Sequence, residues 1–257
     1  QKKQKKRKHP FFIKIYSIIV IYMKVVVFDF DETLGHFGQL GDFIEVMERW
    51  FNKPIKREVL YKLLDIYPFY LRTKIFAILN RIKKLKEDGK INKVIIYTNN
   101  MAPRAWVLGV KTYFELKMNY KLFNRVISAY KVGGKQIEKK RTSHGKTYKD
   151  LLNTANLSGK TKVLFFDDQS HPIQEHENVD YIHVIPYTYI MGTDEMLGRF
   201  FHNKQLRNLI SDKEGFINFM KRELNHYNGG GRGKLVHKIP PDEGNEIIQV
   251  INSFAKY

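Results

Sequence analysis

Acidic side chains end two of the most apolar stretches of this sequence, and a threonine ends a third. The residues concerned are Asp29, Asp31, Thr98, Asp167 and Asp168. If the three stretches are parallel strands, their carboxyl ends meet at the edge of the sheet where ligands bind. Four carboxylates that converge there repel one another unless a cation compensates them. Oxygen-rich sites of this kind suit Mg²⁺, so the pattern predicts a site for that ion.

The rest of the pattern supplies the elements that would position these groups. Apolar runs predict strands, and apolar residues at helical spacing predict helices between them. The strands are expected at 24–31, 93–98, 125–130, 162–168 and 181–186, and the helices at 43–51, 56–66, 71–85, 106–115 and 147–157. Asp42 and Thr147 are expected to be helix N-caps. Strands that alternate with helices predict an α/β fold with a doubly wound parallel sheet.

The two ends of the chain differ in composition from its middle. Residues 1–22 hold seven cations, no acid and an apolar run, which fits a signal anchor, a basic tail or a non-native leader. Lysines interrupt the apolar run, so no membrane span is expected. We expect a core at 23–190 and a helical C-terminal extension at 191–257 packed on that core. A glycine-rich break at 228–233 precedes the last helix of the extension, expected at 243–255.

The chain is basic, with 45 Lys and Arg residues against 26 Asp and Glu and a formal net charge of +19. The segment 131–149, most of it expected to be a loop, holds seven cations and one acid. If it flanks the site, it would attract a substrate that carries several phosphates. The sequence has no cysteine, which excludes disulfides, thiolate zinc sites and cysteine nucleophiles. Without disulfides or a convincing signal peptide, the expected location is cytoplasmic or nuclear.

Four short motifs, in order, resemble those of the haloacid dehalogenase superfamily. VVFDFDETL at 26–34 is similar to its first motif, DxDxT, and IIYT at 95–98 to its second. YKDL at 148–151 resembles the third motif, and LFFDD at 164–168 the fourth. The DETL form resembles the Ser/Thr phosphatases that act on the RNA polymerase II C-terminal domain (the NLI-interacting-factor-like group), including such proteins of large DNA viruses. The resemblance covers 24–190 and implies a Rossmann-like haloacid dehalogenase fold with a small cap or none.

The resemblance also implies catalytic and metal-binding roles. Asp29 would be the nucleophile that forms an aspartyl-phosphate. Asp31 would protonate the leaving oxygen and then activate the water that hydrolyses the intermediate. Mg²⁺ would be held by Asp29, by the backbone carbonyl of Asp31 and by Asp168. Asp167 would orient a lysine or join the outer shell of the metal.

Three further residues are implied to bind the phosphoryl oxygens: Thr98, Asn99 and Lys149. Lys149 is preferred because it opens a helix that leads into the second acidic strand. Its nearby competitors are Lys131, Lys135 and Lys146. The pair Asn99-Asn100 departs from the polymerase-tail phosphatases, which usually have small residues there, although Asn at the first position is common in the wider superfamily.

The function expected from this resemblance is that of a Mg²⁺-dependent phosphatase that acts on phosphoserine or phosphothreonine in proteins. A multiply phosphorylated protein tail is one substrate that this function would include. A less favoured alternative is a phosphatase of the same superfamily that processes nucleic-acid ends carrying a 3′-phosphate, which the net charge favours. A third is a non-catalytic scaffold that retains the fold. The scaffold predicts that at least one catalytic group is missing, whereas every expected group is present in the sequence.

Overall fold

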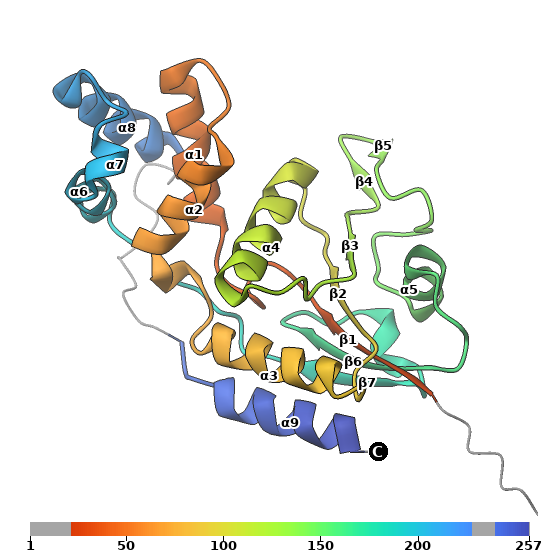
Figure 1. The fold of residues 1–257 in the computed structure, drawn as a ribbon. Coiled ribbons are helices and arrows are strands. Elements are labelled where there is room, and N and C mark those ends of the chain that lie inside the picture. Colours follow the sequence, from red (N-terminus) through yellow and green to blue (C-terminus); the bar gives the residue numbers. More distant parts are fainter. Residues whose placement is uncertain (1–21, 228–239, 257) are drawn as a thin grey trace, which may run out of the picture.

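The centre of the structure is a sheet of five parallel strands in the order β3–β2–β1–β6–β7 (Figure 1). The structure is a computed structural model that describes residues 22–227 and 240–256. The strands are β1 (Met23–Phe28), β2 (Lys93–Tyr97), β3 (Arg125–Ile127), β6 (Thr161–Asp167) and β7 (Val179–His183). Because β2 and β6 flank β1, the carboxyl ends of these three strands lie together at one edge.

Helices cover both faces of this sheet. They are α3 (Ile75–Glu87) and α4 (Arg104–Met118) on one face and α5 (Tyr148–Ala155) on the other. Val26 and Phe28 of β1 belong to the core with α3 and α4, while Val25 and Val27 belong to the core with α5. A strand covered on both faces needs a nearly continuous apolar run. The α/β class and the parallel sheet flanked by helices are confirmed, and the architecture is compatible with a doubly wound, Rossmann-like fold.

A group of helices lies to one side of the sheet (Figure 1). It consists of α1 (Gly38–Phe51), α2 (Arg57–Ile66), α6 (Thr193–His202), α7 (Lys204–Arg207) and α8 (Lys213–Tyr227). Trp50 of α1 packs against Phe216 and Phe219 of α8, with ring centroids 5.6 and 5.4 Å apart. The last helix, α9 (Gly244–Lys256), lies beside α3 (Figure 1). The described residues after Ile190 are therefore mostly helical, as their pattern predicts.

The first helix begins earlier than the sequence predicts. It starts at Gly38, so Asp42 lies inside α1 and Phe37 occupies the N-cap position. The reason is that Leu40, which is fully buried, extends the apolar face of this helix by one turn. The N-cap expected at Thr147 is confirmed, because its side chain accepts a hydrogen bond from the backbone N–H of Asp150 at 3.1 Å.

The predicted loop 131–147 contains a short antiparallel hairpin, β4 (Lys131–Val132) and β5 (Lys135–Gln136). Its turn is formed by Gly133 and Gly134, which both have positive φ. Two short 3₁₀ helices, Pro68–Tyr70 and Pro172–Glu175, complete the described elements. The hairpin rises beyond the sheet above β3 (Figure 1).

The predicted leader, apart from Tyr22, lies outside the described residues, as does the glycine-rich break at 228–233. The helices expected on either side of that break are present as α8 and α9. In the part of the chain that the structure describes, no helix is long and apolar enough to cross a membrane.

Candidate active site

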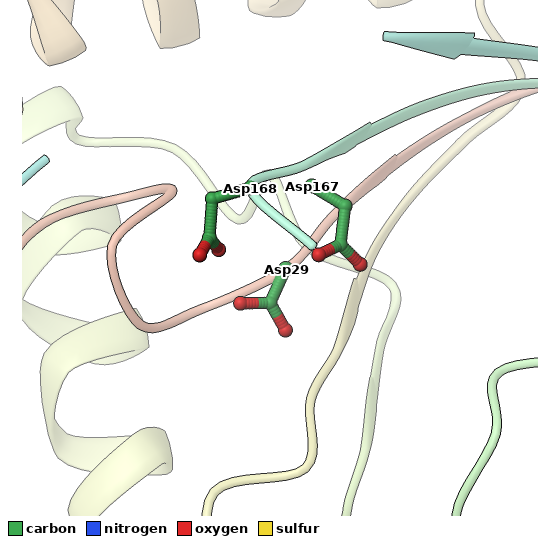
Figure 2. Close-up of side chains that lie close together, drawn as sticks. All are labelled: Asp29, Asp167 and Asp168. Carbon is green, nitrogen blue, oxygen red and sulfur yellow. The ribbon is translucent and has the colours of Figure 1, made fainter. Parts of the chain in front are cut away.

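Three buried carboxylates meet where β1 and β6 end. Asp29 follows β1, Asp167 is the last residue of β6, and Asp168 comes next. The register pairs Phe28 with Phe166, and the backbone N–H of Asp29 donates to the Phe166 carbonyl at 2.9 Å. One ligand oxygen from each Asp lies within 4.8 Å of the others, and Asp167 and Asp168 flank Asp29 (Figure 2). The strand pairing thus brings together acids that are far apart in the sequence.

A buried lysine bridges two of these acids. The Nζ atom of Lys146 donates to Asp29 Oδ1 at 2.5 Å and to Asp167 Oδ2 at 2.7 Å. Its side chain is 2% exposed and its ammonium lies 5.6 Å from the centre of the Phe165 ring. Asp167 also accepts the backbone N–H of Gln169 through Oδ1, at 3.0 Å. Asp167 is therefore held on both oxygens and orients the lysine. Asp168 accepts a long bond from Thr33 Oγ1, at 3.3 Å.

The prediction that Lys149 occupies this position is wrong. Lys149 is exposed on α5, while its neighbours Tyr148 and Asp150 are buried. The cap residue Thr147 turns the chain into the helix. The lysine before the cap therefore reaches the strand ends, and the lysine two residues after the cap points away from the core.

The acids of the site outnumber its buried cation. Burial raises the pKa of Asp29 to about 7; Lys146 opposes this increase, and the charges of Asp167 and Asp31 add to it. Burial also raises the pKa of Asp31 and of Asp168. A divalent cation would compensate the excess negative charge, and carboxylate oxygens are the ligands that hard cations prefer. The buried triad of Asp residues could therefore hold a metal ion.

Metal-free protein is expected to lose thermal stability as the pH rises from about 5 to about 8. The folded protein raises the pKa of Asp29 to about 7, above the value of about 3.9 for an unfolded Asp. The folded state therefore holds an extra proton at the lower pH and loses that advantage as the pH rises through the folded value. Mg²⁺ should restore stability most at the higher pH, because it binds the ionised carboxylates of the folded chain. Calorimetric melting with EDTA or Mg²⁺ measures both effects.

Two Asp→Asn variants serve as controls for this prediction. Asp29→Asn should reduce the fall in melting temperature, because it removes the group that titrates. Asp180→Asn, which alters an exposed acid on β7, should leave the fall unchanged. The prediction would be contradicted if, between pH 5 and pH 8, the melting temperature of metal-free wild type rose relative to that of Asp29→Asn.

Asp31 lies just past β1, at the start of a loop that runs to His36. Asn100 Nδ2 donates to Asp31 Oδ2 at 2.8 Å, and the Asn100 backbone N–H donates to Thr98 Oγ1 at 2.8 Å. Asn100 thus links the loop after β1 to the end of β2. The side chain of Asp31 is not part of the buried triad, in which Asp167 is the third member. The sequence offers no local signal for this link, because Asn100 and Asp31 are 69 residues apart.

Thr98 and Asn99 are held by a second buried cation, Arg141. Its Nη1 donates to the Thr98 carbonyl at 3.1 Å and to the Ser128 carbonyl at 2.8 Å, and its Nη2 donates to Asn99 Oδ1 at 2.8 Å. Thr98 Oγ1 accepts from Asn100, so its own hydroxyl proton is available to another acceptor. Asn99 uses its Oδ1 to accept from Arg141, which leaves its amide Nδ2 as a donor. The end of β2 therefore presents two hydrogen-bond donors.

No family model matches this chain, and no curated protein or solved structure is significantly similar to it. What its site can do therefore follows from its own geometry. That geometry brings Asp29, Asp167 and Asp168 together, and it links Asp31 to Thr98 through Asn100.

The basic segment 131–149 divides into buried and exposed cations. Arg141 and Lys146 are both buried, so they belong to the interior of the site. The exposed members are Lys135, Lys139, Lys140 and Lys149, and Lys131 is half-buried. The number of charges in the sequence does not separate these groups, because a lysine or arginine whose partners are distant in the sequence has no local signature. The segment therefore carries less surface charge than its composition suggests.

Proposed function

We propose that this protein is a Mg²⁺-dependent phosphatase of the haloacid dehalogenase superfamily that works through an aspartyl-phosphate on Asp29. The observation that carries the proposal is the contact of Lys146 with Asp29 and Asp167 beside Asp168. Phosphoryl transfer needs a positioned nucleophile and positive charge around the phosphoryl oxygens. The motif resemblance supports the proposal, because three of the motifs span the carboxyl ends of β1, β2 and β6 and the remaining one opens α5.

In the proposed reaction, a carboxylate oxygen of Asp29 attacks phosphorus while the bond to the leaving oxygen breaks, which gives an aspartyl-phosphate. Asp31 donates its proton to the leaving oxygen, and its raised pKa, caused mainly by burial, favours the protonated form that this step requires. The Asp31 carboxylate then takes a proton from water. That water attacks the phosphorus of the intermediate, which releases inorganic phosphate and restores Asp29 and protonated Asp31.

Three groups would hold the phosphoryl oxygens: the ammonium of Lys146, the hydroxyl of Thr98 and the amide of Asn99. Lys146 already lies against the proposed nucleophile, so its charge would stabilise oxygens bonded to the same phosphorus. Arg141 fixes the carbonyl of Thr98 and the side chain of Asn99 from behind. These donors are therefore placed before a substrate arrives, which is what electrostatic stabilisation requires.

Asp29, Asp168 and the backbone carbonyl of Asp31 would hold the metal ion. A bound Mg²⁺ would supply neutralisation of the negative charge on the phosphoryl group. Asp167 would keep Lys146 in place, because its oxygens are taken by that lysine and by the backbone N–H of Gln169.

An apolar hollow beside the site favours protein substrates. It has a volume of about 280 Å³ and borders both Thr98 and Asn100. Its apolar lining includes Met101, Pro103, Val107, Ala129 and Ile137. A hydrophobic residue next to a phosphoserine or phosphothreonine would bury apolar surface there. Multiply phosphorylated tails would also meet the exposed lysines of the hairpin and the loop that follows it.

The same exposed lysines favour a second candidate, a 3′-phosphatase of nucleic acids. The deciding experiment compares hydrolysis of a phosphoserine peptide and a 3′-phosphorylated oligonucleotide, each with Mg²⁺ and with EDTA. The proposal predicts faster Mg²⁺-dependent release of phosphate from the peptide. Faster release from the oligonucleotide would favour the second candidate. No Mg²⁺-dependent release from either substrate would refute the proposed phosphatase.

A further inference from the structure

A buried arginine outside the acidic cluster holds the loop that carries Asp31. Arg72 follows the first 3₁₀ helix, and its side chain is 4% exposed. Its Nε donates to the Thr33 carbonyl at 2.5 Å, and its Nη2 donates to the Glu32 carbonyl at 2.7 Å. Because the guanidinium is planar and rigid, these bonds fix the two carbonyls relative to each other.

The residues that Arg72 holds lie between the proposed acid and a proposed metal ligand. Glu32 follows Asp31 directly and has a φ of 56°, a left-handed conformation that is costly for a residue with a side chain. Thr33 Oγ1 donates to Asp168 Oδ1. The turn is also packed tightly, since a side chain at Gly35 would come within 2.3 Å of the Tyr70 carbonyl oxygen. A strained turn in this place persists only if its surroundings hold it.

The C-terminal helix supplies an acid that orients Arg72. Glu243, directly before α9, accepts from Arg72 Nη1 at 3.1 Å and from the Ile185 backbone N–H at 2.9 Å, both through Oε2. The start of α9 is seated closely here, because a side chain at Gly244 would come within 2.7 Å of Lys74 Cβ. Glu243 thus compensates a buried guanidinium from a segment 171 residues further along the chain.

We infer that Arg72 and Glu243 are positioning residues: the contact of Glu243 with Arg72, rather than the packing of α9 as a whole, sets the place of Asp31. The role given to Asp31 rests on the proposed function. Arg72 and Glu243 act through the backbone of Glu32 and Thr33. A displaced Asp31 would protonate the leaving oxygen less well, so substrates with poor leaving groups would lose more rate than substrates with good ones.

The test compares Glu243→Ala with the wild-type full chain on a phosphoserine peptide and on p-nitrophenyl phosphate. For the peptide, kcat/KM is expected to fall about tenfold or more, because small misplacements of a catalytic group are costly. For p-nitrophenyl phosphate it should fall less than about threefold, because nitrophenolate leaves without a proton. Glu243→Gln keeps an oxygen acceptor for Arg72 and should recover part of the activity on the peptide.

The matched control is Asn252→Ala. Asn252 lies on the same helix and accepts from Arg81 Nε at 2.5 Å, so this variant perturbs the docking of α9 on α3 without touching Arg72. It should leave the ratio of the two kcat/KM values unchanged. Equal losses on both substrates in Glu243→Ala, or the same change of ratio in Asn252→Ala, would overturn the inference.

Hydrogen exchange separates failure of this inference from failure of the proposed function. The backbone N–H groups of Glu32, Leu34 and His36 donate to Gly35, Phe30 and Tyr70 carbonyls, respectively. They should exchange faster in Glu243→Ala than in Asn252→Ala. If the wild type hydrolyses neither substrate, the proposed function fails while this measurement still decides the positioning of the loop. Unchanged exchange in Glu243→Ala would overturn the inference in either case.

Discussion

Protein with Asp29→Asn is expected to hydrolyse phosphomonoesters at least about 10³-fold more slowly than the wild type. The neutral amide of Asn cannot attack phosphorus to give the acyl phosphate that Asp29 would form. The substitution also removes a buried carboxylate whose pKa is raised to about 7, mainly by burial, and Lys146 keeps Asp167 as a partner. The variant should therefore remain folded, so that lost turnover reports on chemistry.

The measurement is the release of inorganic phosphate from a phosphoserine peptide at saturating Mg²⁺. Asp180→Asn makes the same chemical change at an exposed position on β7 and should match the wild type. With a phosphate-labelled peptide and rapid acid quenching, label should be found on wild-type protein and be released by hydroxylamine, as acyl phosphates are. Unreduced turnover by Asp29→Asn, or label retained on that variant, would exclude Asp29 as the nucleophile.

The second large effect is expected at Lys146. Lys146→Met should lower kcat/KM about 10²-fold or more, because it removes the buried positive charge nearest to the proposed nucleophile. Lys149→Met should remain within about twofold of the wild type, since Lys149 is exposed on α5. Both variants are assayed on the phosphoserine peptide with Mg²⁺. A larger loss of kcat/KM in Lys149→Met than in Lys146→Met would assign the binding of the phosphoryl oxygens to Lys149, the residue that the sequence motif favours.

Stability must be followed in the same experiment. Lys146→Met leaves Asp29 and Asp167 without their shared buried cation, and breaking a buried ion pair costs about 3–5 kcal/mol. Rates are therefore compared well below the melting temperature of each variant. Lys146→Arg keeps the charge and should retain more activity than Lys146→Met, a difference that loss of folded protein alone does not explain.

The features that the sequence predicted well have local signals. The strands β1 and β6 are nearly continuous apolar runs that end in acids, so the hydrophobic pattern predicts their positions. The proximity of Asp29 and Asp168 then follows from the geometry of a parallel sheet. The cap at Thr147 followed from residue type and spacing. The early start of α1 was missed because Asp42 offered a good cap signal that the burial of Leu40 overrides.

The features that the sequence did not predict depend on contacts between distant residues. The choice of Lys146 over Lys149 is decided by which side of the Thr147 cap faces the sheet, which motif spacing does not encode. In the sequence, nothing distinguishes Arg141 from the exposed cations near it. Its burial depends on its contact with the carbonyl of Thr98, which is 43 residues away in the sequence. Arg72 and Glu243 are 171 residues apart, and neither lies in a recognisable motif.

These long separations bear on how the site comes into being while the chain is made. Ribosomes add about 5–20 residues per second from the N-terminus. The partner of Asp29 is 117 residues further on, and the partner of Arg72 is 171 residues further on. At that rate, roughly 10–40 s separate the synthesis of the carboxylates after β1 from the synthesis of Glu243. The order of elements along the chain thus delays the assembly of this site until the segment that holds Glu243 has been made.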